Sequence, residues 1–299
     1  MSGSGPEDAV AIPASFRAMP RWWREGTAWL DALPRLIARQ CRAWGLTIDG
    51  QVAHGSNALV VPVRRVGQPF ALRLSPPSDD FAGEIAALHF WDGRGTVRLI
   101  EYDPATNALL LERLDAARSL AAEPLATAVP IIARLLRATA VRPPPRATST
   151  TEIVHRRIPE LGREWSALGA TGGPQLLQAV LAAARSIPAL TQPTAVNGDL
   201  HYAQVLAGGR DPWLVVDPVL LSGDCGYAVA QLLWTRLDEM PSAAAIRQWF
   251  AVIAREADLD PETARKWVLF RAADYLAWGL RHGLTEDPAR CLRIIQAFT

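Results

Sequence analysis

The stretch that decides the fold is residues 195–218, which read AVNGDLHYAQVLAGGRDPWLVVDP. Two short apolar runs, 205–206 and 213–216, are joined by a turn with two glycines, and this pattern predicts a β-hairpin. An acidic residue stands beside each run: Asp199 precedes the first, and Asp217 ends the second. Two carboxylates on a rigid hairpin suit one chemistry well. One takes a proton from an attacking hydroxyl, and the other holds Mg²⁺ on a phosphate chain.

The spacing inside this stretch points the same way. Gln204 lies five residues after Asp199. In protein-kinase-like folds a base Asp precedes an amide metal ligand by this interval, and a second metal-binding Asp follows on the next strand pair. The segments NGDLHYAQVL and PWLVVDP resemble the aminoglycoside phosphotransferases, above all their streptomycin and hydroxyurea kinase branch, whose motif runs roughly HGDLHxxNVL and then PWLxIDPxPLxGDPxxDL.

The resemblance implies an ATP- and Mg²⁺-dependent O-phosphotransferase that acts on a hydroxyl of a small molecule, an aminoglycoside-like or other antibiotic. On the matching positions, Asp199 is the catalytic residue that accepts or orients the hydroxyl proton. Asp217 is the expected ligand of Mg²⁺, and Gln204 is expected to add a side-chain oxygen to the same ion.

Composition narrows the class of protein. The chain has 299 residues, 49% of them hydrophobic and 20% charged, which is enough for a core in one large or two modest domains. A net charge of +1 argues against nucleic acid as a partner, and no apolar stretch is long enough to predict a membrane span. Three cysteines without metal-type spacing and an N-terminus without signal-peptide features predict a cytoplasmic protein, whose oligomeric state the sequence does not indicate.

Hydrophobic periodicity separates the chain into a strand-rich and a helix-rich part. Strands are expected at 47–53, 58–64, 70–74, 97–102 and 108–112, with a helix at 79–92 after the third. Helices are expected at about 29–44 with a kink or restart at Pro34, twice within 151–190, and at 226–238, 242–257, 262–284 and 287–298, while 1–20 reads as a mobile leader.

This order predicts an α+β, protein-kinase-like fold with a small antiparallel β lobe, a larger helical lobe and a cleft between them. The expected organisation is an N-terminal leader and helix at 1–46, a nucleotide-binding β lobe at 47–115, and a catalytic and acceptor-binding helical lobe at 116–299. The turn at 54–57, His-Gly-Ser-Asn, sits where kinase folds cover the nucleotide phosphates, but its single glycine fits an ordinary hairpin turn equally well.

The resemblance also implies nucleotide-binding residues in the β lobe. Arg73 on the third strand occupies the position of a phosphate-neutralising Lys, and Glu84 on the next helix is its candidate partner. The strand LLLERLD resembles the interlobe hinge, so Glu112, Arg113 and Leu114 are candidates to bind adenine through their main chain, although a plain strand end is an equal alternative.

Several positions depart from the family pattern. Arg73 keeps the charge of Lys in a longer, planar group, in a chain whose single lysine is Lys266. Gln204 replaces Asn, which moves the amide oxygen by about 1.5 Å, one carbon–carbon bond. Ala228 stands where an Asp that braces the catalytic loop is expected, and Asp224 is a candidate to replace it.

These departures keep two alternatives open. One is a pseudokinase-like protein that binds nucleotide or a metabolite without phosphoryl transfer, and the other is an enzyme that reuses the fold for different chemistry. Acidic and aromatic side chains in the C-terminal helices can line an acceptor pocket or can be surface acids and core tryptophans. They are Asp238, Glu239, Asp274, Trp234, Trp267 and Trp278.

Overall fold

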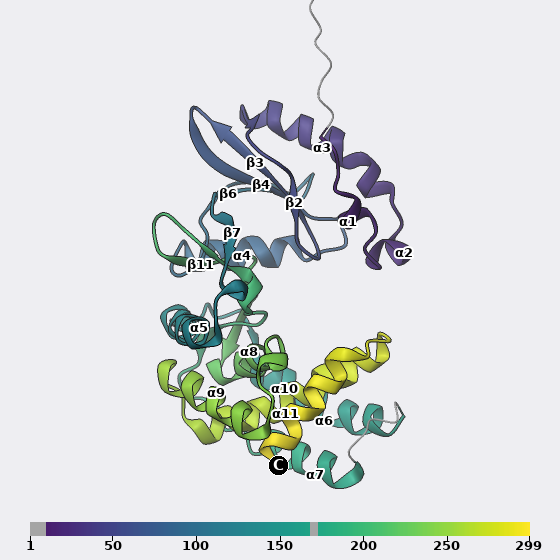
Figure 1. The fold of residues 1–299 in the computed structure, drawn as a ribbon, viewed down its shortest axis with the longest axis vertical. Helices are drawn as coiled ribbons and strands as arrows, with labels where there is room; N and C mark the ends of the chain where they lie inside the picture. The colour runs from purple at the N-terminus through teal and green to yellow at the C-terminus, as the bar shows by residue number, and fades with distance from the viewer. Residues whose placement is uncertain (1–9, 168–172) are drawn as a thin grey trace, which may run out of the picture. The chain divides into compact units, whose positions relative to one another are not determined.

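The computed structural model describes residues 10–167 and 173–299. The chain divides into two compact units. Unit 1 comprises Met1–Gly93 and Val97–Leu114, and unit 2 comprises Arg94–Thr96 and Asp115–Thr299 (Figure 1).

Unit 1 is built on an antiparallel sheet with the strand order β1-β3-β4-β6-β5, in which β2 pairs with β3. The strands are β1 (Thr47–Ile48), β2 (Ala53–His54), β3 (Leu59–Arg65), β4 (Gln68–Leu74), β5 (Leu99–Asp103) and β6 (Ala108–Glu112). The predicted small antiparallel β lobe is therefore confirmed. The segment expected as one strand at 47–53 is two short strands instead, separated by a stretch in which Gly50 has a φ of 148°.

The side chains of β4 alternate between two helices of unit 1. Leu72 and Leu74 belong to the apolar cluster that holds α3 (Ala28–Trp44), whereas Arg73 between them bonds to α4 (Phe81–Trp91). Because successive side chains of a strand point to opposite faces, α3 and α4 lie on opposite faces of the sheet (Figure 1). A single helix α3 spans Pro34, where the sequence predicted a kink or restart.

The N-terminal segment is part of the core of unit 1. Within residues 10–20, predicted as leader, α1 (Ala14–Arg17) carries Phe16, which is fully buried, and α2 (Arg21–Glu25) follows with Trp22 buried. The indole Nε1 of Trp22 donates to the carbonyl of Phe16 at 2.6 Å, and the two rings meet edge to face. The leader prediction is wrong for these residues because their aromatic side chains pack on the sheet; residues 1–9 lie outside the described part.

Unit 2 is mainly helical, as predicted. Its α-helices are α5 (Leu125–Thr139), α6 (Thr150–Ala167), α7 (Gly173–Arg185), α8 (Val229–Trp234), α9 (Ala243–Glu256), α10 (Pro261–Arg281) and α11 (Glu286–Phe298). Short 3₁₀ helices are η1 (Leu120–Ala122), η2 (Tyr202–Gln204), η3 (Cys225–Ala228) and η4 (Leu237–Glu239). Helix α10 contacts α7, α8 and α11 and contributes many buried residues, including Trp267 and Phe270, so it forms the centre of this core.

Two small sheets of unit 2 contain the strands of residues 195–218, the stretch from which the fold was predicted. One joins β7 (Asp115–Ser119), β10 (Val205–Ala207) and β11 (Trp213–Val215), and β10 and β11 form the predicted hairpin. The other joins β8 (Thr148–Ser149), β9 (Thr194–Asn197) and β12 (Leu220–Gly223). The chain leaves β9 just before Asp199 and enters β12 just after Asp217, so both sheets anchor the loops that carry the two aspartates.

Candidate active site

The register of the hairpin brings Gln204 and Asp217 to the same end. Val205 pairs with Val215, and the N–H of Val216 donates to the carbonyl of Gln204 at 2.8 Å. Asp217 is the next residue and has a φ of 55°, in the left-handed region. That conformation costs a non-glycine residue about 1–2 kcal/mol, and strain of this kind is typical of functional sites.

Asn197 fixes the other side of the same loop. Its Oδ1 accepts from the N–H of Asp199 at 3.1 Å and from the N–H of Val219 at 3.0 Å. One amide therefore joins the start of the Asp199 loop to the segment that follows Asp217. The short polar side chain at this position, where the family motif has His, contributes to the geometry of both loops.

The carboxylate of Asp199 is held at both of its oxygens. Oδ2 accepts from Nε2 of Gln204 at 2.9 Å, and Oδ1 accepts from Nε2 of Gln231 at 2.7 Å. An ionised carboxylate only accepts hydrogen bonds, so both amides present their NH₂ groups to it. Both glutamines are buried, with 8% and 7% of their surface exposed, and Gln231 is a site residue that the sequence did not indicate.

This arrangement leaves one oxygen for a metal. With its Nε2 facing Asp199, Gln204 has a buried Oε1 without a hydrogen-bond partner. Such an orphaned acceptor costs about 1–3 kcal/mol, and an oxygen of this kind is what Mg²⁺ prefers as a ligand. In the described part of the chain no three His, Cys, Asp or Glu side chains gather into a metal site.

The pKa of His201 is affected by both Asp199 and Asp217. Burial lowers the pKa of His201, and the charges of Asp199 and Asp217 partly oppose this effect. Both carboxylates thus lie within electrostatic reach of a single imidazole. The two acidic groups that the sequence paired therefore both affect the same imidazole.

The ion pair expected in the β lobe is present in unit 1. Arg73 on β4 and Glu84 on α4 meet at 2.7 Å, with only 9% and 10% of their side chains exposed. Helix α4 begins next to this pair, where Oδ1 of Asp80 caps the N–H of Gly83 at 3.0 Å. The cap sets the first turn of α4, and this turn carries Glu84 toward the sheet.

The three predicted adenine contacts lie where β6 ends. The N–H of Glu112 donates to the carbonyl of Arg98 at 2.9 Å, so this donor is already used inside unit 1. The guanidinium of Arg113 bonds to the carboxylate of Asp49 and to the carbonyl of Val63, which ties the strand end to the rest of the sheet. Leu114 is half-buried and is the last residue of unit 1.

The 54–57 turn is a hairpin turn bound to the N-terminal helices. Nε2 of His54 contacts the hydroxyl of Ser15 at 2.7 Å, and Asn57 accepts from the guanidinium of Arg21 at 3.1 Å. Of the two interpretations that the sequence allowed, these contacts favour a structural turn.

The acids proposed for an acceptor pocket are all in ion pairs. Asp274 bonds to Arg157 at 2.7 Å, and Asp238 and Glu239 pair with neighbouring arginines. Trp267 is a core residue with 1% exposed, while Trp278 is 40% exposed and stacks on Tyr275 at a ring distance of 5.3 Å. Burial and the neighbouring Asp287 raise the pKa of Tyr275, whose hydroxyl donates to the carboxylate of Asp287 at 3.0 Å.

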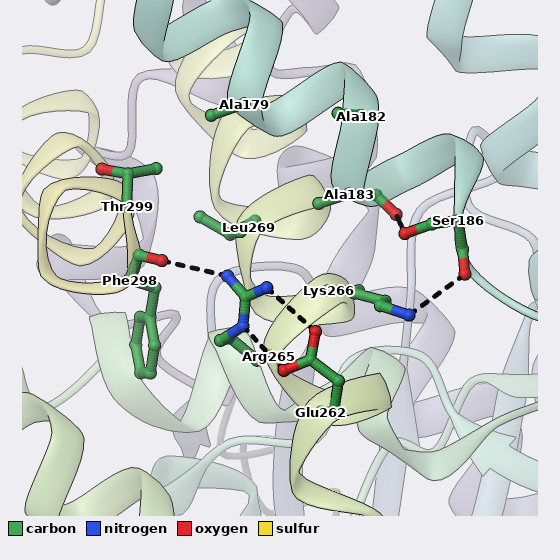
Figure 2. Close-up of a pocket in the computed structure, with 10 residues that line it drawn as sticks. All are labelled: Ala179, Ala182, Ala183, Ser186, Glu262, Arg265, Lys266, Leu269, Phe298 and Thr299. Carbon is green, nitrogen blue, oxygen red and sulfur yellow. Dashed lines mark hydrogen bonds and ion pairs between the residues drawn. The ribbon is translucent and has the colours of Figure 1, made fainter.

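A pocket of about 450 Å³ lies elsewhere in unit 2, between α7, α10 and α11 (Figure 2). The two positively charged side chains that line it, Arg265 and Lys266, form hydrogen bonds at helix ends. Arg265 bonds to Glu262 and to the carbonyl of Phe298 at 3.0 Å, and Lys266 reaches the carbonyl of Ser186 at 3.3 Å. These contacts stabilise the C-terminal carbonyls of α11 and α7, and the pocket contains none of the predicted site residues.

No helix in the described ranges combines the length and the apolar character needed to cross a lipid bilayer.

Comparison with solved structures defines the class of protein. The chain superposes on the aminoglycoside phosphotransferase APH(4)-Ia with a TM-score of 0.63 at 16% identity, over 88% of this chain and 98% of that one. It superposes on choline kinase LicA from Streptococcus pneumoniae with a TM-score of 0.60 at 10% identity, over 89% and 98%. The fold is therefore that of the kinase-like small-molecule phosphotransferases, as predicted.

Sequence comparison gives the family. Residues 43–283 match the family model described as aminoglycoside/hydroxyurea antibiotic resistance kinase, and the chain belongs to this family. It is 36% identical over 270 residues to hydroxyurea phosphotransferase of Kitasatospora aureofaciens, covering 89% of this chain and 78% of that protein. It is 34% identical over 280 residues to streptomycin 6-kinase of Streptomyces griseus, covering 91% of both.

Proposed function

We propose that this protein transfers the γ-phosphoryl group of ATP to a hydroxyl of a small molecule, an antibiotic of the kind named for its relatives. The observation that carries the proposal is the group formed by Asp199, Gln204 and Asp217. Asp199 is a half-buried carboxylate that accepts from two amides, and Gln204 has an amide oxygen without a hydrogen-bond partner. Asp217 follows the second strand of the hairpin in a left-handed conformation. Phosphoryl transfer needs little more than such positioning and charge.

In the proposed reaction Asp199 orients the acceptor hydroxyl. The two amides occupy one acceptor position on each carboxylate oxygen, which leaves further lone pairs for the hydroxyl hydrogen. The hydroxyl oxygen forms a bond to the γ-phosphorus, and the bond from that phosphorus to the β–γ bridging oxygen breaks. The hydroxyl proton passes to Asp199, and ADP and a phosphate ester are the products.

Asp217 and Gln204 would hold the metal through a carboxylate oxygen and Oε1. Bound Mg²⁺ supplies neutralisation of the phosphate charge. In unit 1, Arg73 would add a fixed positive charge for the phosphates, with its orientation set by Glu84. The main-chain groups of Arg113 and Leu114 remain the proposed adenine contacts, together with the carbonyl of Glu112.

The test is Asp199→Asn, which keeps the size of the side chain and removes the base. With streptomycin and hydroxyurea as the first acceptors, kcat should fall by about 10²–10⁴-fold, while ATP binding stays within twofold. Asp211→Asn is the matched control, because Asp211 lies in the exposed turn of the same hairpin and pairs with its neighbour Arg210. Nucleotide binding by the parent enzyme without turnover of any hydroxylated acceptor would favour the pseudokinase alternative instead.

A further inference from the structure

The proposed chemistry does not explain why Gln231 on α8 contacts Asp199. Gln231 donates from Nε2 to Oδ1 of Asp199 at 2.7 Å across 32 positions of sequence. Gln231 is 7% exposed, and the carboxylate of Asp199 that it contacts is half-buried. Hydrogen bonds to a charged group are stronger than those between two neutral groups.

The helix that carries Gln231 is a firm support. The other residues of α8, Val229, Ala230, Leu232, Leu233 and Trp234, are all buried. The carbonyl of Gln231 itself accepts from the hydroxyl of Thr235 at 2.7 Å. The side chain therefore extends from a packed helix rather than from a loop, and a rigid element places a polar group more accurately than a loop does.

Gln231 and Gln204 hold the same carboxylate in different ways. Gln204 lies on η2 and presents its other amide atom, Oε1, to the proposed metal. Gln231 lies on α8, away from Asp217 in the chain, and reaches the second oxygen of Asp199. With one oxygen fixed from each side, the carboxylate cannot rotate about its Cβ–Cγ bond without breaking a hydrogen bond.

We propose that Gln231 is a positioning residue for phosphoryl transfer, which fixes the carboxylate plane of Asp199 independently of the metal. The proposal rests on the function proposed above. The remaining lone pairs of Asp199 then have one orientation toward the acceptor hydroxyl before substrate arrives. Since a misplacement of about 1 Å can lower turnover about 10²-fold, loss of this contact should act on kcat rather than on nucleotide binding.

Gln231→Met tests this with little change in volume and without the donor. We expect kcat to fall about 10- to 100-fold, with the KM for ATP within twofold of the parent value. Gln231→Glu removes the donor and adds a negative charge beside Asp199, and its kcat should fall at least as far. The matched control is Gln40→Met, because Gln40 is a 1% exposed glutamine in α3 whose Oε1 accepts from Thr106 at 3.1 Å, in unit 1. It should lower the melting temperature but leave kcat of the folded enzyme within twofold.

A crystal structure of the Gln231→Met variant gives a readout that does not depend on turnover. We expect the Asp199 carboxylate to rotate or to occupy two orientations while the hairpin stays in place. An unchanged carboxylate, or a parental kcat in the folded variant, overturns the proposal. If the parent enzyme transfers no phosphate to any acceptor, the proposed function fails by itself, and the crystal structure still decides whether Gln231 sets the orientation of Asp199.

Discussion

At the scale of single residues, the buried ion pair of Arg73 and Glu84 makes unit 1 sensitive to one substitution. Both side chains are about nine-tenths buried, and they meet at 2.7 Å between β4 and α4. Removing one partner of a buried pair is more harmful than replacing both, because the remaining charge loses its counterion.

We therefore expect Arg73→Met to lower the free energy of unfolding by about 3–5 kcal/mol and to weaken ATP binding. Urea unfolding and nucleotide titration measure the two effects. The double variant Arg73→Met with Glu84→Gln should recover part of the stability but none of the ATP affinity, since the phosphate-facing charge is still missing. Full recovery of both, or no coupling between the two substitutions, would contradict this account.

Single residues of the candidate site also show which contacts a sequence can predict and which it cannot. Gln204 follows Asp199 by five residues and contacts it, and Asp217 comes just after the second strand of the hairpin, so spacing and strand register were sufficient to consider these three residues together. Gln231 reaches Asp199 from 32 residues away, and a glutamine in a helix has no local pattern that distinguishes a buried donor from a surface residue. Its proximity depends on the packing of α8, which a single sequence does not show.

At the scale of elements, the short helix η3 explains the role of Asp224. The sequence made Asp224 a candidate to brace the catalytic loop in place of the residue missing at Ala228. Its Oδ1 instead accepts from the N–H of Gly226 at 2.6 Å and caps η3, while Gln231 contacts Asp199. Burial raises the pKa of Asp224, since desolvation outweighs the hydrogen bond from Gly226.

This raised pKa gives a pH-dependent prediction. The folded state binds the proton of Asp224 more tightly than the unfolded chain, so this group favours folding below its ordinary pKa of 3.8. Its contribution is lost as pH rises from there through the folded-state pKa. Asp224→Asn keeps an oxygen for the cap and removes the buried charge, so the variant should be at least as stable as the parent at pH 7. As the pH rises from 4 to 7, the melting temperature should fall less for the variant than for the parent. An equal fall in both proteins would contradict the raised pKa of Asp224 as a source of this pH dependence.

The N-terminal helices show a limit of the sequence at the element scale. Residues 14–17 were expected to be a leader because four residues carry too little periodicity to indicate a helix, yet Phe16 is fully buried in the core of unit 1. We expect Phe16→Ala to lower the free energy of unfolding by about 3–5 kcal/mol, the usual loss for a large buried aromatic side chain. Urea denaturation measures it, with the 78% exposed Trp23→Ala as control, which should change stability by less than about 0.5 kcal/mol.

At the scale of the whole molecule, the strand-rich and helix-rich parts of the sequence correspond to two separately packed units. Each was predictable because strand alternation and helical periodicity are local signals. The two units contribute different chemistry to the proposed reaction. Unit 1 carries the Arg73–Glu84 pair, and unit 2 carries the aspartates and their glutamines. The proposed function therefore predicts a part of nucleotide binding that depends on Mg²⁺ and on Asp217 and Gln204 in unit 2, and this part can be measured separately.

The last prediction concerns the stability of the complete protein with nucleotide. A ligand that binds only the folded state at 100 times its Kd stabilises that state by about 2.7 kcal/mol. Mg²⁺-ATP should therefore raise the melting temperature by several degrees, and ATP with EDTA should raise it less, because the phosphates then lack the ion held by Asp217 and Gln204. Asp217→Asn should remove the difference between these two conditions, whereas Asp211→Asn in the exposed turn should preserve it. If Asp217→Asn retains the full Mg²⁺-dependent increase, then Asp217 is not the metal ligand, and the strain recorded in its φ of 55° must serve another purpose.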